Sequence, residues 1–196
     1  MKSIATGSRL ICLFSICSCL LSCREKTSER GESFFPVLSF LNSQVAMVDT
    51  SLYPILKLTP RDSAGADTTY IHREQFRSVS SEFLAIPDIS AEKFRDRYRE
   101  SKQFDQGLNL VILTYEAIKP AEELLQSEQV TIQPGIGGDK VKNIIINTYS
   151  HSKDSSVQKR MLWNADESFQ VSTIKQFPGQ PETTSSYKVT WNEHEY

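Results

Sequence analysis

All four cysteines of this 196-residue chain lie within its first 23 residues. A body without cysteines cannot be held by disulfide bonds, so its stability must come from a hydrophobic core. Cys-x-Cys and Cys-x3-Cys spacings also occur in metal and redox sites. Here the cysteines stand in a hydrophobic run with no histidine nearby, so we interpret Cys12, Cys17 and Cys19 as small apolar residues.

The N-terminal residues follow the three-part pattern of a secretory signal. Lys2 and Arg9 precede an apolar run, Leu10 to Leu21, that is interrupted only by two serines. A membrane-spanning helix needs about 20 apolar residues, and this run is shorter. We therefore predict a signal peptide over residues 1–22.

The signal ends in Leu20-Leu21-Ser22-Cys23, which resembles the lipobox of bacterial lipoproteins. In that motif an aliphatic residue precedes a small residue and then a cysteine, although Leu21 stands where a small residue is more common. The resemblance covers only the first 23 residues. It implies lipidation of the Cys23 thiol and cleavage before Cys23. A second frame that ends at Cys19 would cut the apolar run short. The expected partner is therefore a membrane, reached through the lipid on Cys23, and no disulfide partner is expected.

The remaining chain divides into a tether and one domain. Residues 23–33 are polar after the cysteine and lack an apolar stripe, which predicts a lipid-anchored flexible tether with an end-to-end distance of about 15–20 Å. Residues 34–196 then suit a single globular domain. Two of the 22 basic residues and none of the 24 acidic residues lie in the signal, so the rest carries a formal charge of −4. This weakly acidic balance argues against nucleic acid as a partner.

The first half of the domain has helical periodicity around a short hairpin. We predict a helix from Pro36 to about Val48, because proline is favoured at a first helical position and apolar residues recur along one side. Residues 53–59 and 68–74 are predicted to pair as strands across a turn that contains Pro, Gly and Asp. Two middle helices are expected over residues 73–85 and 90–101.

From Leu108 onward the apolar period changes from helical to two residues. Six short segments with this pattern follow, and their connections are too short for a crossover helix, which predicts an antiparallel meander. The glycine-rich stretch 134–140 lacks the spacing of a phosphate-binding loop and is interpreted as a turn. The expected fold class is therefore α+β, with an N-terminal helix and hairpin, two middle helices, and a C-terminal meander that the helices cover on one face.

Trp163 and Trp191 are the largest side chains available to the core. Each lies in a segment with an alternating apolar face. We predict that both pack under the helices, and that Trp191→Ala lowers the free energy of unfolding by about 3–5 kcal/mol. The alternative is an aromatic face that stays open for a partner. The same substitution would then impair binding and leave folding intact.

No catalytic, cofactor or metal motif is recognisable in the sequence, so no residue is predicted for these roles. His151 and Asp154 would supply only two ligands to a metal. Serine is abundant, but no G-x-S-x-G motif marks a nucleophile. An enzymatic alternative remains, an envelope hydrolase whose site is assembled from distant residues with His72 or His151 as the base.

Residues 34–45 (FFPVLSFLNSQV) and 161–174 (MLWNADESFQVSTI) resemble small uncharacterised lipoproteins of Bacteroidota. This resemblance implies an anchor in an outer membrane. It also makes Asp62-Ser63-Ala64 and Asp67-Thr68-Thr69 similar to the Asp-Ser/Thr-aliphatic O-glycosylation sites of exported proteins in that phylum. A plain surface turn is the simpler interpretation of these residues.

Together these observations favour a lipid-anchored envelope protein with a non-catalytic binding or structural role, in which an unidentified envelope protein is a further candidate partner. A carrier or chaperone for an apolar ligand is the first alternative, and it requires a curved sheet with an unfilled apolar interior. The hydrolase is the second. The shape of the sheet and the surroundings of the two histidines distinguish these alternatives.

Overall fold

The computed structural model describes residues 33–61 and 65–192. These described residues belong to one compact unit. The predicted signal peptide, the predicted lipidation site Cys23, nearly all of the predicted tether and Ser63 lie outside the described residues, so these expectations stay predictions. Among the described residues, no helix is long and apolar enough to cross a membrane.

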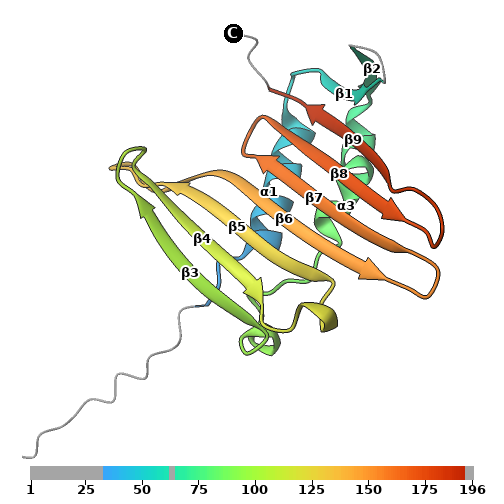
Figure 1. Ribbon diagram of the computed structural model, residues 1–196. Coiled ribbons are helices and arrows are strands. Elements are labelled where there is room, and N and C mark those ends of the chain that lie inside the picture. The colour runs from blue at the N-terminus through green and yellow to red at the C-terminus, as the bar shows by residue number, and fades with distance from the viewer. Residues whose placement is uncertain (1–32, 62–64, 193–196) are drawn as a thin grey trace, which may run out of the picture. The chain divides into compact units, whose positions relative to one another are not determined.

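In the part of the chain that the structure describes, nine strands form one antiparallel sheet (Figure 1). The strands are β1 Ile55–Pro60, β2 Ala66–Ile71, β3 Tyr98–Asp105, β4 Leu110–Ala117, β5 Leu125–Gln133, β6 Lys140–His151, β7 Ser156–Asn164, β8 Ser168–Gln176 and β9 Thr183–Thr190. Their order across the sheet is β2-β1-β9-β8-β7-β6-β5-β4-β3. The meander therefore runs from β3 to β9, and the N-terminal hairpin joins it because β1 pairs with β9.

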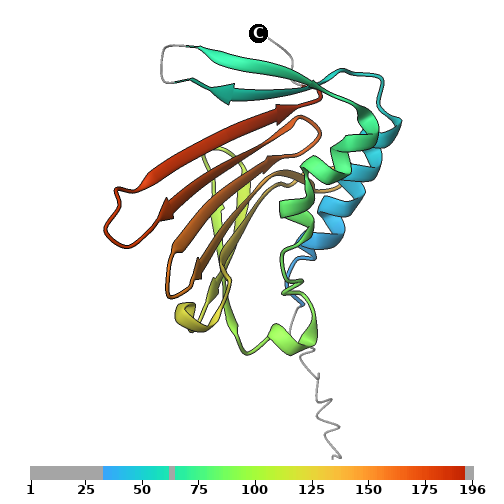
Figure 2. The same cartoon turned by 90° about the vertical axis from the view of Figure 1, so that its right-hand side faces the viewer.

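The helices lie on one side of this sheet, which we call its inner face (Figure 2). They are α1 Val37–Thr50, α2 Phe76–Val79 and α3 Ser81–Leu84, with single 3-10 turns at Arg73–Gln75, Glu92–Phe94 and Pro120–Glu122. The apolar stripe predicted for the first helix is confirmed, since Val37, Leu41, Val45 and Val48 are all buried. Each buried aliphatic side chain of this kind stabilises the fold by roughly 1.5–3 kcal/mol.

The predicted fold class, α+β with two middle helices, is wrong, because the described domain is mostly a nine-stranded sheet. The largest error concerns residues 90–101, which contain one 3-10 turn and the start of strand β3. Strand β3 pairs with β4 along its whole length, from Tyr98 opposite Ala117 to Asp105 opposite Leu110. The backbone hydrogen bonds between β3 and β4 satisfy the polar groups along one edge of the apolar strand β4. They outweigh the weak local preference of residues 90–101 for a helix.

The other middle helix is broken into short pieces. Ser80 leaves the helical conformation between α2 and α3, with φ −88° and ψ 4°. Its hydroxyl donates to the Arg77 carbonyl at 3.3 Å, a local bond of the kind that competes with helix continuation. As a result, two one-turn helices replace one of three turns, and they direct Phe76 and Phe83 into the core.

The turn predicted at residues 134–140 is confirmed and connects β5 to β6. The Gly138 N–H donates to the Gly135 carbonyl at 3.0 Å, which closes the turn. Gly138 has φ +111°, a backbone conformation that side chains with a Cβ rarely adopt, so glycine is required there.

The prediction that both tryptophans pack under the helices is also confirmed. Trp163 and Trp191 are 0% and 4% exposed. The Phe83 ring lies 5.1 Å from Trp163, and the Phe76 ring lies 5.1 Å from Trp191, both nearly edge-on. Phe169 stacks on Trp163 at 5.3 Å, so these five rings form one aromatic cluster between helices and sheet. Such pairs add about 0.5–1.5 kcal/mol each beyond the burial of their area.

Trp163→Ala and Trp191→Ala should each lower the free energy of unfolding by about 3–5 kcal/mol, because truncation of either ring leaves a cavity in the aromatic cluster. Urea denaturation followed by far-ultraviolet circular dichroism measures the change. The corresponding Trp→Phe variants should lose less. A midpoint within error of the wild type for either alanine variant would contradict the assignment to the core.

Candidate functional site

Two adjoining cavities lie beside α1, where the ends of strands β6 to β9 approach it. The apolar cavity has a volume of about 490 Å³, and its main walls are Met47, Val48, Leu52, Tyr53 and Trp191, with Asp166 at its rim. The polar cavity has a volume of about 790 Å³, and its lining includes Phe35, Lys140, Lys142, Asn143, Asp166 and Glu167. Asp166 and Asn192 line both, so the two cavities form a groove along α1.

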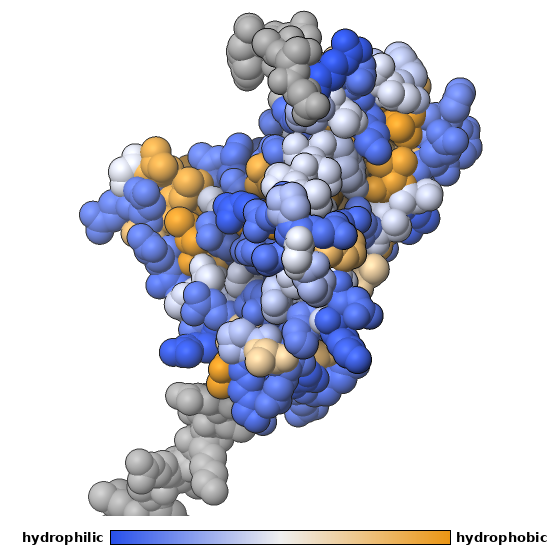
Figure 3. All heavy atoms as spheres, turned by 45° about the vertical axis from the view of Figure 1, so that its right-hand side comes forward, coloured by the Kyte–Doolittle hydropathy of each residue, from blue (hydrophilic) through white to orange (hydrophobic). Residues whose placement is uncertain are grey.

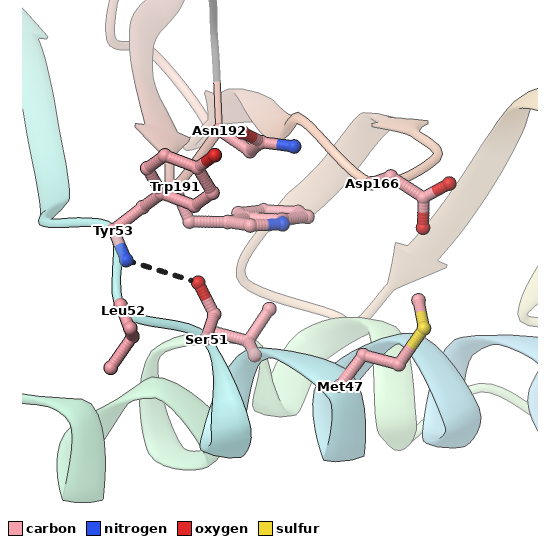
Figure 4. Close-up of a pocket in the computed structure, with 8 residues that line it drawn as sticks. Met47, Ser51, Leu52, Tyr53, Asp166, Trp191 and Asn192 are labelled. Carbon is pink, nitrogen blue, oxygen red and sulfur yellow. Dashed lines mark hydrogen bonds between the residues drawn. The ribbon is translucent and has the colours of Figure 1, made fainter.

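One side of α1 supplies a wall of this groove. Gln44, Met47, Val48 and Ser51 occupy positions i, i+3, i+4 and i+7, which places them on adjacent turns of one side of the helix. The helix ends at Thr50, and Ser51 is extended, so the chain turns across the mouth of the apolar cavity. The Ser51 hydroxyl accepts a hydrogen bond from the backbone N–H of Tyr53 at 3.2 Å (Figure 4).

The end of α1 is held by an arginine from the following segment. The Arg73 guanidinium donates to the backbone carbonyls of Val48 and Tyr53, the latter at 3.0 Å. Carbonyls in the last turn of a helix have no partner within the helix, so this contact satisfies one of them and fixes the linker that follows.

The opposite wall is Trp191, immediately after β9. Its backbone N–H donates to the Glu167 carbonyl at 3.0 Å, and the Asn192 N–H donates to the same oxygen at 3.3 Å. The turn between β7 and β8 therefore positions the end of β9. Figure 4 shows the indole ring facing the last turn of α1, with Tyr53 at one end of the cavity and Asp166 toward the other.

A buried amide fixes the position of Asp166. Gln44 is 5% exposed, and its amide nitrogen donates to the Asp166 carboxylate at 2.9 Å. The Gln44 amide oxygen accepts from the backbone N–H of Asp166 at 2.8 Å and from the Trp163 indole at 3.4 Å. Asp166 itself is exposed and has φ +64°, which aspartate tolerates better than most residues. Asp166 is therefore held at the rim of the groove by two hydrogen bonds to one buried side chain, one at its carboxylate and one at its backbone N–H.

The geometry suits the binding of an apolar group. A cavity of several hundred cubic ångströms with apolar walls and a few polar groups is the usual form of a ligand site. Met47, Leu52 and Tyr53 are 49%, 97% and 53% exposed, so a ligand would cover surface that the fold itself leaves in water. On the face in Figure 3, hydrophobic residues gather in separate patches between hydrophilic ones.

The histidines considered from sequence lie elsewhere. His72 is exposed just before the first 3-10 turn, and its backbone N–H donates to the Gln75 side chain at 3.3 Å. His151 is exposed at the end of β6, in a shallow cavity of about 250 Å³ whose lining includes Ser152 and Ser155. The structure brings neither histidine to the groove beside α1. Thr68, the other glycosylation candidate, is exposed on β2.

A second polar group, Glu128, is buried on the inner face of β5, away from the groove. It stands opposite Tyr115 of β4 and Ile146 of β6 and is 1% exposed. Among the described residues, its two carboxyl oxygens are the buried side-chain atoms without a hydrogen-bond partner. Burial, reinforced by the charge of Asp88, raises the pKa of Glu128 to about 8, because an ionised carboxylate is poorly solvated in the core. The carboxyl is therefore mostly protonated at neutral pH.

Two tyrosines flank this acid. Burial raises the pKa of the Tyr98 and Tyr115 hydroxyls above the usual range, so both stay protonated. The Tyr98 hydroxyl donates to the Leu125 carbonyl at 3.0 Å, and the Tyr115 hydroxyl accepts from the Phe35 N–H at 2.9 Å. The second bond ties the segment before α1 to β4.

Sequence reasoning missed Gln44, Asp166 and Glu128, although two of them left a signal. Gln44 interrupts the apolar stripe between Leu41 and Val45, where a polar residue must find a buried partner. Glu128 alternates with Val130 on an apolar strand face. Asp166 left no comparable signal, because a hairpin turn is an ordinary place for aspartate.

Within residues 33–61 and 65–192, no group of three or more His, Cys, Asp or Glu side chains is placed to hold a metal ion. No protein-family model, curated protein or solved structure matches this chain.

The contribution of Glu128 to the free energy of unfolding should fall as the pH rises from about 4.5 to about 8, because the folded protein keeps a proton on Glu128 that the unfolded chain releases. Glu128→Gln removes this titration at nearly constant size. Its stability relative to the wild type should therefore increase through the same window. Urea denaturation at pH 5 and pH 8.5 measures both slopes. Glu116→Gln, exposed on the other face of β4, is the control, and an unchanged slope in Glu128→Gln would reject the assignment.

Proposed function

We propose that this protein is a non-catalytic binding protein of the bacterial cell envelope, held at a membrane by lipid on Cys23, and that it binds an apolar ligand in the apolar cavity. The observation that carries the proposal is that cavity of about 490 Å³ between the end of α1 and Trp191. The lipobox resemblance at Leu20 to Cys23 supports the anchor. The resemblance of residues 34–45 and 161–174 to Bacteroidota lipoproteins supports an outer membrane as the site of the proposed anchor.

Burial of exposed apolar surface would supply the binding free energy. Each square ångström of apolar surface that leaves water contributes about 25 cal/mol, before the cost of immobilising the ligand. Leu52 and Met47 both line the cavity with largely exposed aliphatic side chains, while Trp191 packs against Phe76 in the core. A rigid aromatic wall with flexible aliphatic side chains opposite can adapt to ligands of different shape.

The inner face leaves little room for a carrier that encloses its ligand. Leu41, Phe76 and Phe83 fill the space under the helices and are fully buried. A ligand inside the sheet would have to displace these side chains, whereas a ligand in the groove would displace only water. We therefore place the ligand at the groove, partly exposed, and propose binding in preference to enclosed transport.

The anchor predicts covalent lipidation at one residue. Metabolic labelling with an alkyne-modified palmitate should label the wild-type protein and leave Cys23→Ala unlabelled, because the thiol is the predicted attachment site. Cys19→Ala, which tests the second frame, should keep the label. Equal labelling of the wild type and Cys23→Ala would reject the anchor.

Hexan-1-ol should bind in the apolar cavity and shift the indole N–H resonance of Trp191 in a nuclear magnetic resonance titration. Leu52→Ser should weaken this binding about threefold to tenfold, because it removes one apolar wall. It should leave stability unchanged, since Leu52 is 97% exposed. Ile136→Ser is the matched control, an equally exposed residue in the turn between β5 and β6. An equal loss of hexan-1-ol affinity in both variants would contradict the assignment of the ligand to the apolar cavity.

A further inference from the structure

We infer that the apolar cavity selects a small amphiphile whose polar end is a cationic amine, and that the ammonium group binds the Asp166 carboxylate. This inference rests on the proposed function and adds the chemical class of the ligand. Apolar walls alone would accept alcohols, acids and amines of the same length equally well. The charge at the rim of the cavity decides between them.

Eight described residues line the apolar cavity. Asp166 carries a negative charge, and the other seven are neutral. The lysines of the groove, Lys140 and Lys142, line the polar cavity only. A ligand in the apolar cavity therefore meets a negative charge with apolar and aromatic surface around it. A carboxylate ligand would meet repulsion at the same position.

The carboxylate is already oriented before any ligand arrives. Gln44 holds it from the protein side with one bond at 2.9 Å and holds the backbone of the same residue with another at 2.8 Å. An ionised carboxylate offers about four acceptor positions, so this single accepted bond leaves room for an ammonium group. Because the side chain needs no reorganisation, less conformational entropy is lost on binding than at a freely rotating aspartate.

Two further features favour a cation over a neutral group. The face of the Trp191 indole is turned toward the cavity, and an aromatic face attracts a cation within about 6 Å (Figure 4). The C-terminal end of α1 carries partial negative charge. Arg73 already satisfies the Val48 carbonyl, so we assign this second effect less weight than the carboxylate and the indole.

The test compares three probes that share a six-carbon chain: hexylamine, hexan-1-ol and hexanoate, at pH 7, where the first is a cation and the last an anion. The full-length protein is titrated in detergent micelles, and the indole N–H resonances are followed. The chain has two tryptophans. Trp191 reports on the cavity directly, whereas the Trp163 indole N–H donates to Gln44 and reports on the site only through that hydrogen bond.

Hexylamine should bind about fivefold more tightly than hexan-1-ol, the size expected of one partly exposed ion pair, and hexanoate should bind most weakly. In Asp166→Asn, amine and alcohol should agree within about twofold. Asparagine tolerates the left-handed backbone and keeps an oxygen for Gln44, so the variant should fold, and a urea melt checks this. Glu167→Gln is the control, because Glu167 lines only the polar cavity, and it should keep the preference.

The possible failures are distinguishable. If hexylamine and hexan-1-ol bind equally to the wild type, or if Asp166→Asn keeps the amine preference, the inference is overturned while the apolar site stands. If none of the three probes shifts the Trp191 resonance, both the inference and the proposed binding site are overturned.

Discussion

Phe76 and Phe83, from two helices of one turn each, rest on Trp163, Phe169 and Trp191 of the sheet. Helices of this length are not stable in isolation, so their conformation depends on this contact. The sheet depends on it equally, because the inner face of β7 to β9 would otherwise be exposed. No cysteine is present beyond residue 23 that could substitute for this packing with a covalent bond.

The candidate site is an extension of the same packing. α1 buries one stripe in the core, and the adjacent side of the helix supplies Gln44 to the polar cavity and Met47 to the apolar cavity. Trp191 likewise contacts the aromatic cluster and forms a wall of the cavity. Gln44 links the two regions directly, because its amide oxygen accepts from the buried Trp163 indole and from the backbone of Asp166. A ligand at the groove would therefore rest on side chains that are also packed in the core.

Sequence patterns predicted the elements whose conformation is set by residues close to them in sequence. The stripe of α1, the turn at residues 134–140 and the alternating strands near the C-terminus follow from helical periodicity, glycine geometry and pleat. Residues 90–101 were misassigned because the hydrogen-bonding needs of β4, a strand formed later in the chain, decide their conformation. The groove was not predictable for the same reason, since Gln44 and Asp166 are brought together only by the complete fold.

The pairing of β1 with β9 joins the N-terminal hairpin to a strand of residues 183–190. A ribosome therefore releases β1 well before β9, and until β9 follows, β1 and β8 each present an open edge. The sheet cannot be completed until residues 183–190 have been synthesised. The pairing of β1 with β9 joins segments that are distant in sequence, and such contacts form slowly. Slow closure would leave time for chaperones to engage such a chain, and termination before residue 183 would leave the edges of β1 and β8 unpaired.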